Sequence, residues 1–234
     1  MSFNPFHALS IDSIGQQIIA IGALGTAAFG LVDATKAVRG GVSNRGFGVI
    51  QAALEPFDAA LRKALGDNPG CDWKTMMKSH WINGRPKDEQ KAIAVSLIQL
   101  GLTDENAAAL AAAGQVEPAA LQAVVAALTK GEELTPVQLN VLGRFKATIE
   151  ARVDAAYERA DQLYRTTARA VAGIVAVLLA VAVVAITTNF GGDANTYLAA
   201  ALVGLVAVPL APIARDLASA LSTAATALGR RVAG

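Results

Sequence analysis

The chain has 234 residues, of which 53% are hydrophobic and 17% are charged, and its formal net charge is +1. This balance excludes a disordered chain, which needs high charge and low hydrophobicity, and it argues against a strongly basic nucleic-acid-binding protein. A single cysteine excludes an intramolecular disulfide framework, so the composition favours a membrane protein.

The first predicted element is a transmembrane helix at residues 13–35. Residues 13–32 carry no charge, and at 1.5 Å per residue they reach about 30 Å, the thickness of a hydrocarbon core. Residues 1–12, predicted to be external, contain no lysine or arginine, whereas a cleaved signal peptide needs a basic segment there. A buried or interfacial glycine-rich helix is the alternative interpretation.

Residues 36–134 are predicted to form a helical cytoplasmic domain, because apolar residues recur there at helical spacing and no alternating strand pattern is present. A bend is expected at Pro56, and Thr103 is expected to cap a helix. The next expected helix begins at Pro118 and buries a stripe at helical spacing, formed by Leu121, Val124, Val125 and Leu128.

The most informative pattern begins at Thr135, where Thr135, Pro136 and Gln138 form a predicted capping box. No proline follows until after Thr188, so we expect one very long helix over residues 136–188. Its first part, residues 135–169, is an amphipathic stalk that must cover its apolar face, on the small helices of the same domain, on a second copy, or on both. The expected stripe is Phe145, Ile149, Val153, Ala156, Ala160 and Leu163.

The rest of the chain predicts a transmembrane hairpin followed by a cytoplasmic amphipathic tail. Residues 170–192 and 194–214 carry no charge, which predicts spans at 170–190 and 195–214 joined by an external link at 191–194. Pro209 and Pro212 are expected to kink the third span, and residues 215–234 form the tail. The fold class is therefore an all-α integral membrane protein with three transmembrane helices and a helical cytoplasmic domain.

Lysine and arginine are distributed unevenly, and this predicts the orientation. Residues 1–35 and 170–214 contain none, whereas 17 of the 20 lie between Lys36 and Arg169 and the last three follow Ala214. Basic residues are retained on the cytoplasmic side of a membrane. We therefore expect an external N-terminus and a cytoplasmic C-terminus in the inner membrane.

The segment from Phe145 to Val203 resembles the C-terminal part of a broad set of uncharacterised bacterial multi-pass membrane proteins, in which a charged helix runs into a transmembrane hairpin. The matching residues are Asp154, Arg159, Tyr164, Arg165, Asn189 and Asp193. About 60 residues are covered, the link is longer here, and the aromatic start of the family's link is absent. The resemblance implies this topology and a bacterial source, and it implies no activity.

Two groups of residues are candidate contact sites. Gly22, Thr26 and Gly30 recur every four residues on the first span, and small residues at this spacing let helices approach closely, within or between subunits. Trp73, Met77 and Trp81 lie at i, i+4 and i+8, and they form either part of a core or a patch for a partner or a membrane surface.

Catalytic, cofactor and metal sites are not expected. Cys71, Asp72 and His80 supply at most a partial metal shell, and nucleotide-binding motifs and nucleophile elbows are missing from the sequence. The expected partners are the lipid bilayer and further membrane-protein subunits, including copies of the same chain, without nucleic acid. The sequence thus favours a non-enzymatic structural or interaction protein, with a homo-oligomeric pore as the alternative.

Overall fold

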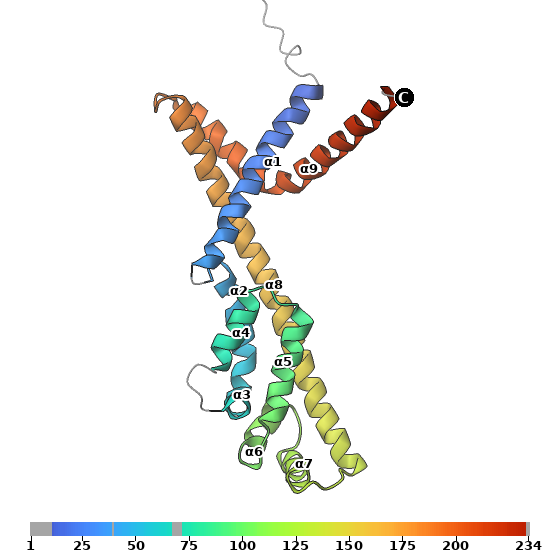
Figure 1. The fold of residues 1–234 in the computed structure, drawn as a ribbon. Coiled ribbons are helices and arrows are strands. Elements are labelled where there is room, and N and C mark those ends of the chain that lie inside the picture. Colours follow the sequence, from blue (N-terminus) through green and yellow to red (C-terminus); the bar gives the residue numbers. More distant parts are fainter. Residues whose placement is uncertain (1–10, 39, 67–71, 233–234) are drawn as a thin grey trace, which may run out of the picture. The chain divides into compact units, whose positions relative to one another are not determined.

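The computed structural model describes residues 11–38, 40–66 and 72–232, and all regular structure in these residues is helical (Figure 1). This confirms the all-α prediction for the described chain. The helices are α1 (Ile11–Ala34), α2 (Ser43–Leu54), α3 (Asp58–Leu65), α4 (Trp73–Ile82), α5 (Lys87–Leu100), α6 (Asp104–Ala113), α7 (Pro118–Lys130), α8 (Pro136–Thr187) and α9 (Ala194–Val232).

Three of these helices contain segments long and apolar enough to cross a membrane, as the charge-free runs predict. They are the segment Gly15–Ala37, helix α8 and the segment Ala194–Ala220. The expected single helix after Thr135 is also present, because α8 is continuous over 52 residues. Its end at Thr187 and the start of α9 at Ala194 place the link at residues 188–193, slightly earlier than expected.

The chain divides into two compact units, and α8 contributes to both. The first unit comprises Met1–Val42 and Thr166–Gly234, and the second comprises Ser43–Arg165. The second unit contains α2 to α7 together with α8 up to Arg165, which is most of the stalk expected at residues 135–169. The stalk therefore packs on the small helices of its own chain, which is the first of the two arrangements that its apolar face allowed.

Local sequence signals set the ends of the helices in the second unit. The capping boxes are present: the Thr135 N–H donates to Gln138 Oε1 at 2.9 Å, and the Thr103 N–H donates to Asn106 Oδ1 at 2.8 Å. A short 3-10 helix at Glu55–Phe57 separates α2 from α3. It contains Pro56, the residue at which a bend was expected. Gly101 follows α5, and a Cβ atom at this position would lie 1.8 Å from the Ala60 carbonyl oxygen. A residue with a side chain would therefore collide with the backbone of α3.

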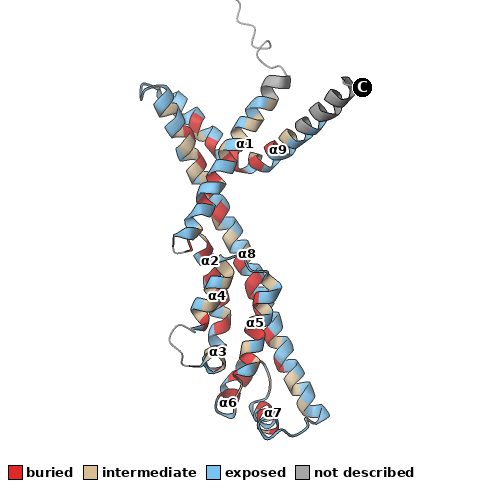
Figure 2. Ribbon diagram, viewed as in Figure 1, coloured by how far each residue is buried: buried red, intermediate tan, exposed pale blue. Residues whose placement is uncertain are grey.

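The core of the second unit is formed by one face of α8 and the inner faces of the shorter helices (Figure 2). Phe145, Ile149, Val153 and Ala160 are buried on α8 as expected, but Leu163 is 40% exposed. Tyr157 is fully buried and belongs to the same face. The Trp81 ring contacts the rings of Tyr157 and Tyr164 edge-on, at centroid distances of 6.2 and 6.5 Å. Leu128, expected in the α7 stripe, is 50% exposed in the last turn of α7.

In the first unit, the C-terminal part of α8 and the N-terminal part of α9 form a hairpin, and α1 packs against α9. Asn189 and Phe190 adopt positive φ angles of 49° and 62° in the link, which reverses the chain within six residues. Figure 1 shows that α9 bends part-way along, and Pro209 and Pro212 lie inside this helix. The helix nevertheless continues to Val232, so the expected third span and tail form one bent helix in the described residues.

Candidate interaction surfaces

Helix α1 meets α9 through glycines that bring the two backbones together. A Cβ atom on Gly22 would lie 2.0 Å from the Ala214 Cβ, and one on Gly25 would lie 2.2 Å from the Ala207 carbonyl oxygen. Ala28 and Val32 are buried further along the same helix. The contact face of α1 therefore follows steps of three and four residues, and Gly25 belongs to it although the sequence pattern did not single it out.

The other two members of the predicted small-residue series are exposed and are not buried against α9. Thr26 is exposed, and its hydroxyl donates to the Gly22 carbonyl oxygen of the same helix at 2.9 Å. A Cβ atom on Gly30 would meet nothing within 4 Å. Within this chain the structure thus places Gly22 at the α1–α9 contact, Thr26 at an open hollow beside that contact, and Gly30 in open space.

Trp73 and Met77 lie in the core of the second unit, with side chains that are 1% and 0% exposed. The Trp73 indole N–H donates to Asp58 Oδ1 at 2.8 Å, so its polar atom is satisfied inside the domain. Trp81 is half-buried, and its indole N–H donates to the Ser43 carbonyl oxygen at 2.9 Å. The structure thus places Trp73 and Met77 in the core and packs the half-buried Trp81 against it, in line with the first of the two interpretations.

A buried polar pair lies next to this cluster and was missed by the sequence interpretation. The Tyr157 hydroxyl donates to Gln90 Oε1 at 3.3 Å, and Gln90 Nε2 donates to the Arg85 carbonyl oxygen at 2.6 Å. Burial raises the pKa of the Tyr157 hydroxyl well above its ordinary value, so the phenol stays protonated. This chain of hydrogen bonds joins α5 to α8 through groups that would be costly to bury unpaired.

Ion pairs join the exposed edges of α5 and α8. Lys87 Nζ lies 3.0 Å from Asp161 and 3.2 Å from Glu158, and Lys91 Nζ lies 2.6 Å from Asp154. The hydrogen bond that Lys87 donates to Asp161 raises the pKa of Lys87, and the one that Lys91 donates to Asp154 raises the pKa of Lys91. The sequence contains a pattern that predicts such pairs: two lysines lie one turn apart on α5, and carboxylates lie at helical spacing on α8.

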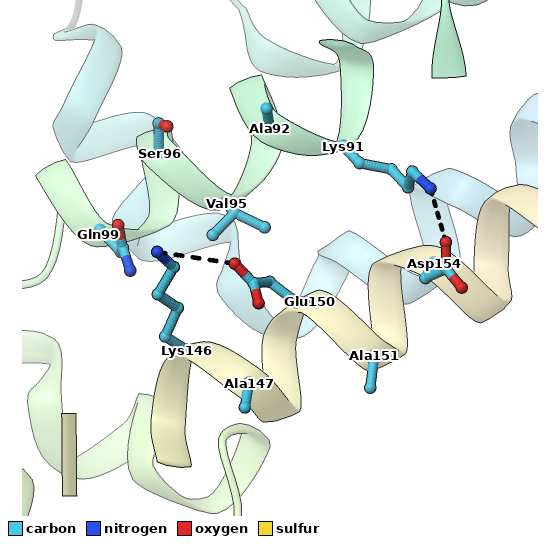
Figure 3. Close-up of a pocket in the computed structure, with 10 residues that line it drawn as sticks. All are labelled: Lys91, Ala92, Val95, Ser96, Gln99, Lys146, Ala147, Glu150, Ala151 and Asp154. Carbon is cyan, nitrogen blue, oxygen red and sulfur yellow. Dashed lines mark hydrogen bonds and ion pairs between the residues drawn. The ribbon is translucent and has the colours of Figure 1, made fainter. Parts of the chain in front are cut away.

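Beside these pairs, α5 and α8 enclose an open groove of about 600 Å³ (Figure 3). Figure 3 shows the pairs Lys91–Asp154 and Lys146–Glu150 along the groove, with Val95 between the two helices and small side chains on the helices to either side. These small residues are Ala92, Ser96, Ala147 and Ala151. A second hollow shares Gln99 with the groove and continues to Leu102, Leu128 and Leu142, so the surface becomes more apolar along its length.

Removing the Asp161 carboxylate is expected to destabilise the α5–α8 contact only where this group is ionised. Burial raises the pKa of Asp161, but hydrogen bonds from Lys87 and Arg165 outweigh burial and lower it overall. The ionised group therefore stabilises the folded chain above the unfolded pKa of about 3.9, and this contribution is lost as pH falls through the lower folded pKa. We expect Asp161→Asn to reduce stability at pH 7 by about 0.2–1 kcal/mol.

Thermal unfolding of the purified chain between pH 7 and pH 2.5 measures this effect. The difference between Asp161→Asn and the wild type should shrink toward zero at the acid end. Glu132→Gln is the matched control, because Glu132 is exposed and has no ion-pair partner within the described residues. A difference that stays constant with pH would contradict the assigned role of the Asp161 charge.

Within the described residues, no group of three or more histidine, cysteine, aspartate or glutamate side chains is placed to hold a metal ion. Cys71, one of the residues considered for a partial shell, lies outside these residues. No protein-family model, curated protein or solved structure matches the chain.

Proposed function

We propose that the chain is a non-enzymatic structural or interaction protein of the bacterial inner membrane, a scaffold or a subunit of a membrane complex. Its second unit would lie on the cytoplasmic side and bind a helix of another protein chain. Three helices apolar enough to span a membrane support the location, and the placement of 17 basic residues between Lys36 and Arg169 supports the orientation.

The single observation that carries the interaction role is the groove between α5 and α8. Val95 is buried at its base, exposed small side chains such as Ala92 and Ala147 let a third helix approach closely, and the lining also includes Lys91 and Glu150. A helix that presents charges of both signs would pair with these charged residues while covering the small residues. The more apolar hollow beyond Gln99 would extend the contact.

Photo-crosslinking in the native membrane tests this proposal. A photoreactive amino acid in place of Ala147 in the groove should form an adduct larger than the 24.0 kDa chain. The crosslinked residues of the partner should lie three or four positions apart, on one face of one helix. Ala109 on α6 is the control position, because it is exposed but does not line the groove. Equal crosslinking from both positions would contradict the proposed interaction role. So would the absence of any adduct from position 147 in a chain that runs as a monomer.

The orientation has a separate test. A reporter inserted at Asp193 should be active only outside the cytoplasm, and one inserted at Gln115, between α6 and α7, only inside it. The reverse pattern would show that the proposed topology is inverted.

A further inference from the structure

An apolar groove runs along the α8–α9 hairpin of the first unit. The two helices approach closely at Gly204, where a Cβ atom would lie 2.5 Å from the Val177 Cα. Toward Arg169 they enclose a hollow of about 420 Å³, lined by Gly173 and Ile174 from α8 and by Leu205 and Pro209 from α9. A Cβ atom on Gly173 would meet nothing within 4 Å, so the missing side chain helps to form this hollow.

The walls of this hollow are too exposed and too apolar to face water without cost. Ile174 and Leu178 are each 63% exposed, and Leu205 is 61% exposed. Burial of such side chains is worth about 25 cal/mol per Å² of apolar surface, so the groove favours an apolar occupant.

One end of the groove carries a positive charge. Arg169 lines it, is exposed, and has no ion-pair partner in the part of the chain that the structure describes. A guanidinium group presents several N–H donors in a planar fork that matches the oxygens of a phosphate group. The groove therefore combines an apolar channel with a group suited to an anionic head.

The length of the groove matches one leaflet of a bilayer. Leu178 lies nine positions after Arg169, or about 14 Å along the helix axis, which is close to half of a hydrocarbon core of about 30 Å. The charge-free run begins at Ala170, so Arg169 lies where a span would meet the headgroups.

We propose that this groove binds an anionic phospholipid, with an acyl chain along Gly173 and Leu205 and the phosphate group at Arg169. The proposal rests on the proposed membrane location. A second hollow, near the hairpin link, provides a contrast: it is also mostly apolar, but Asp193 lines it and its carboxylate would repel a phosphate group. Basic grooves between transmembrane helices are known to select anionic headgroups.

Native mass spectrometry of the full chain in mild detergent tests the proposal, with titration of phosphatidylglycerol and of phosphatidylcholine that carry the same acyl chains. Phosphatidylglycerol should bind more tightly. Arg169→Gln should weaken phosphatidylglycerol binding about fivefold, the effect of about 1 kcal/mol per basic residue, and should remove the preference. Gly173→Leu should weaken both lipids, because the new side chain fills the groove.

Two substitutions on the same helix serve as matched controls. Gly143 is also a glycine of α8 with open space around it, so Gly143→Leu makes the same change outside the groove. Arg144 is exposed in the second unit, so Arg144→Gln removes an equal charge. Both controls should bind the two lipids as the wild type does, and helical circular dichroism of all four variants verifies that they fold.

Several results would overturn the lipid site. These are equal binding of the two lipids to the wild type, unchanged binding to Arg169→Gln, and binding of glycerol 3-phosphate as tight as that of phosphatidylglycerol. Loss of a dimer in Gly173→Leu, with lipid binding unchanged, would show that a second copy covers the groove. Alkaline extraction of membranes separates this proposal from the proposed location: a chain released by carbonate contradicts both, whereas a retained chain without lipid preference contradicts the lipid site alone.

Discussion

Replacing Trp73 by alanine is expected to lower the free energy of unfolding of the second unit by about 3–5 kcal/mol, the usual cost of deleting a large buried aromatic side chain. Trp73 is 1% exposed, packs with Met77 in the core, and donates its indole N–H to Asp58. For a unit of this size, a change of this magnitude corresponds to a decrease in melting temperature on the order of 10–20 °C. Differential scanning fluorimetry of the purified full chain measures it.

Two further variants separate the parts of this effect. Trp73→Phe keeps most of the buried ring but leaves Asp58 without its indole donor, so it should be destabilised by a smaller amount, about 1–2 kcal/mol. Leu139→Ala should change the melting temperature little, because Leu139 is 55% exposed. A Trp73→Ala chain that melts like the wild type but loses membrane or partner binding would instead support a surface patch.

Replacing Gly25 by leucine is expected to separate α1 from α9. Even a methyl group on Gly25 would lie 2.2 Å from the Ala207 carbonyl oxygen and 3.1 Å from the Ala211 Cβ, and a backbone atom cannot rotate away as a side chain can. The distance between the helix axes should therefore increase by roughly 2 Å, the range over which this distance varies with side-chain size. Pulsed electron paramagnetic resonance measures this distance between spin labels at Leu31 and Leu202.

The labelled positions and the control come from the same two helices. Leu31 and Leu202 are 51% and 56% exposed, so labels there leave the contact intact, and Cys71→Ser removes the native cysteine. Gly30→Leu is the matched control, because its side chain would enter open space on α1. An equal increase for both variants, or none for Gly25→Leu, would contradict the assigned contact face. A Gly30→Leu chain that dissociates into monomers would assign Gly30 to a contact between subunits.

Local signals predicted much of the helical structure. Thr135 and Gln138 form the predicted capping box, Pro56 lies in the short helix that separates α2 from α3, and α8 is continuous as expected. These features depend on neighbours within four residues, so they can be read along the chain. The charge-free runs likewise predicted three helices apolar enough to span a membrane.

The sequence predicted the candidate interaction surfaces less well than it predicted the helices. A period of four residues relates Gly22, Thr26 and Gly30, but the buried face of α1 follows steps of three and four residues, and it includes Gly25 instead of Thr26. The groove between α5 and α8 needs residues that are more than 50 positions apart in the chain, such as Lys91 and Asp154. Opposite charges on two helices allow many different ion pairs, and only the packing of the helices determines which ones form.

The sequence by itself therefore determined the helical class, the helix ends and the apolar segments, because each depends on local hydrogen bonding or on composition over a short window. Only the tertiary structure decided that Trp73 lies in a core, that Tyr157 replaces Leu163 on the buried face of α8, and that Gly25 lies at the α1–α9 contact. The physical reason is that burial depends on which neighbour covers a side chain, and helical periodicity specifies a face without specifying what packs against it.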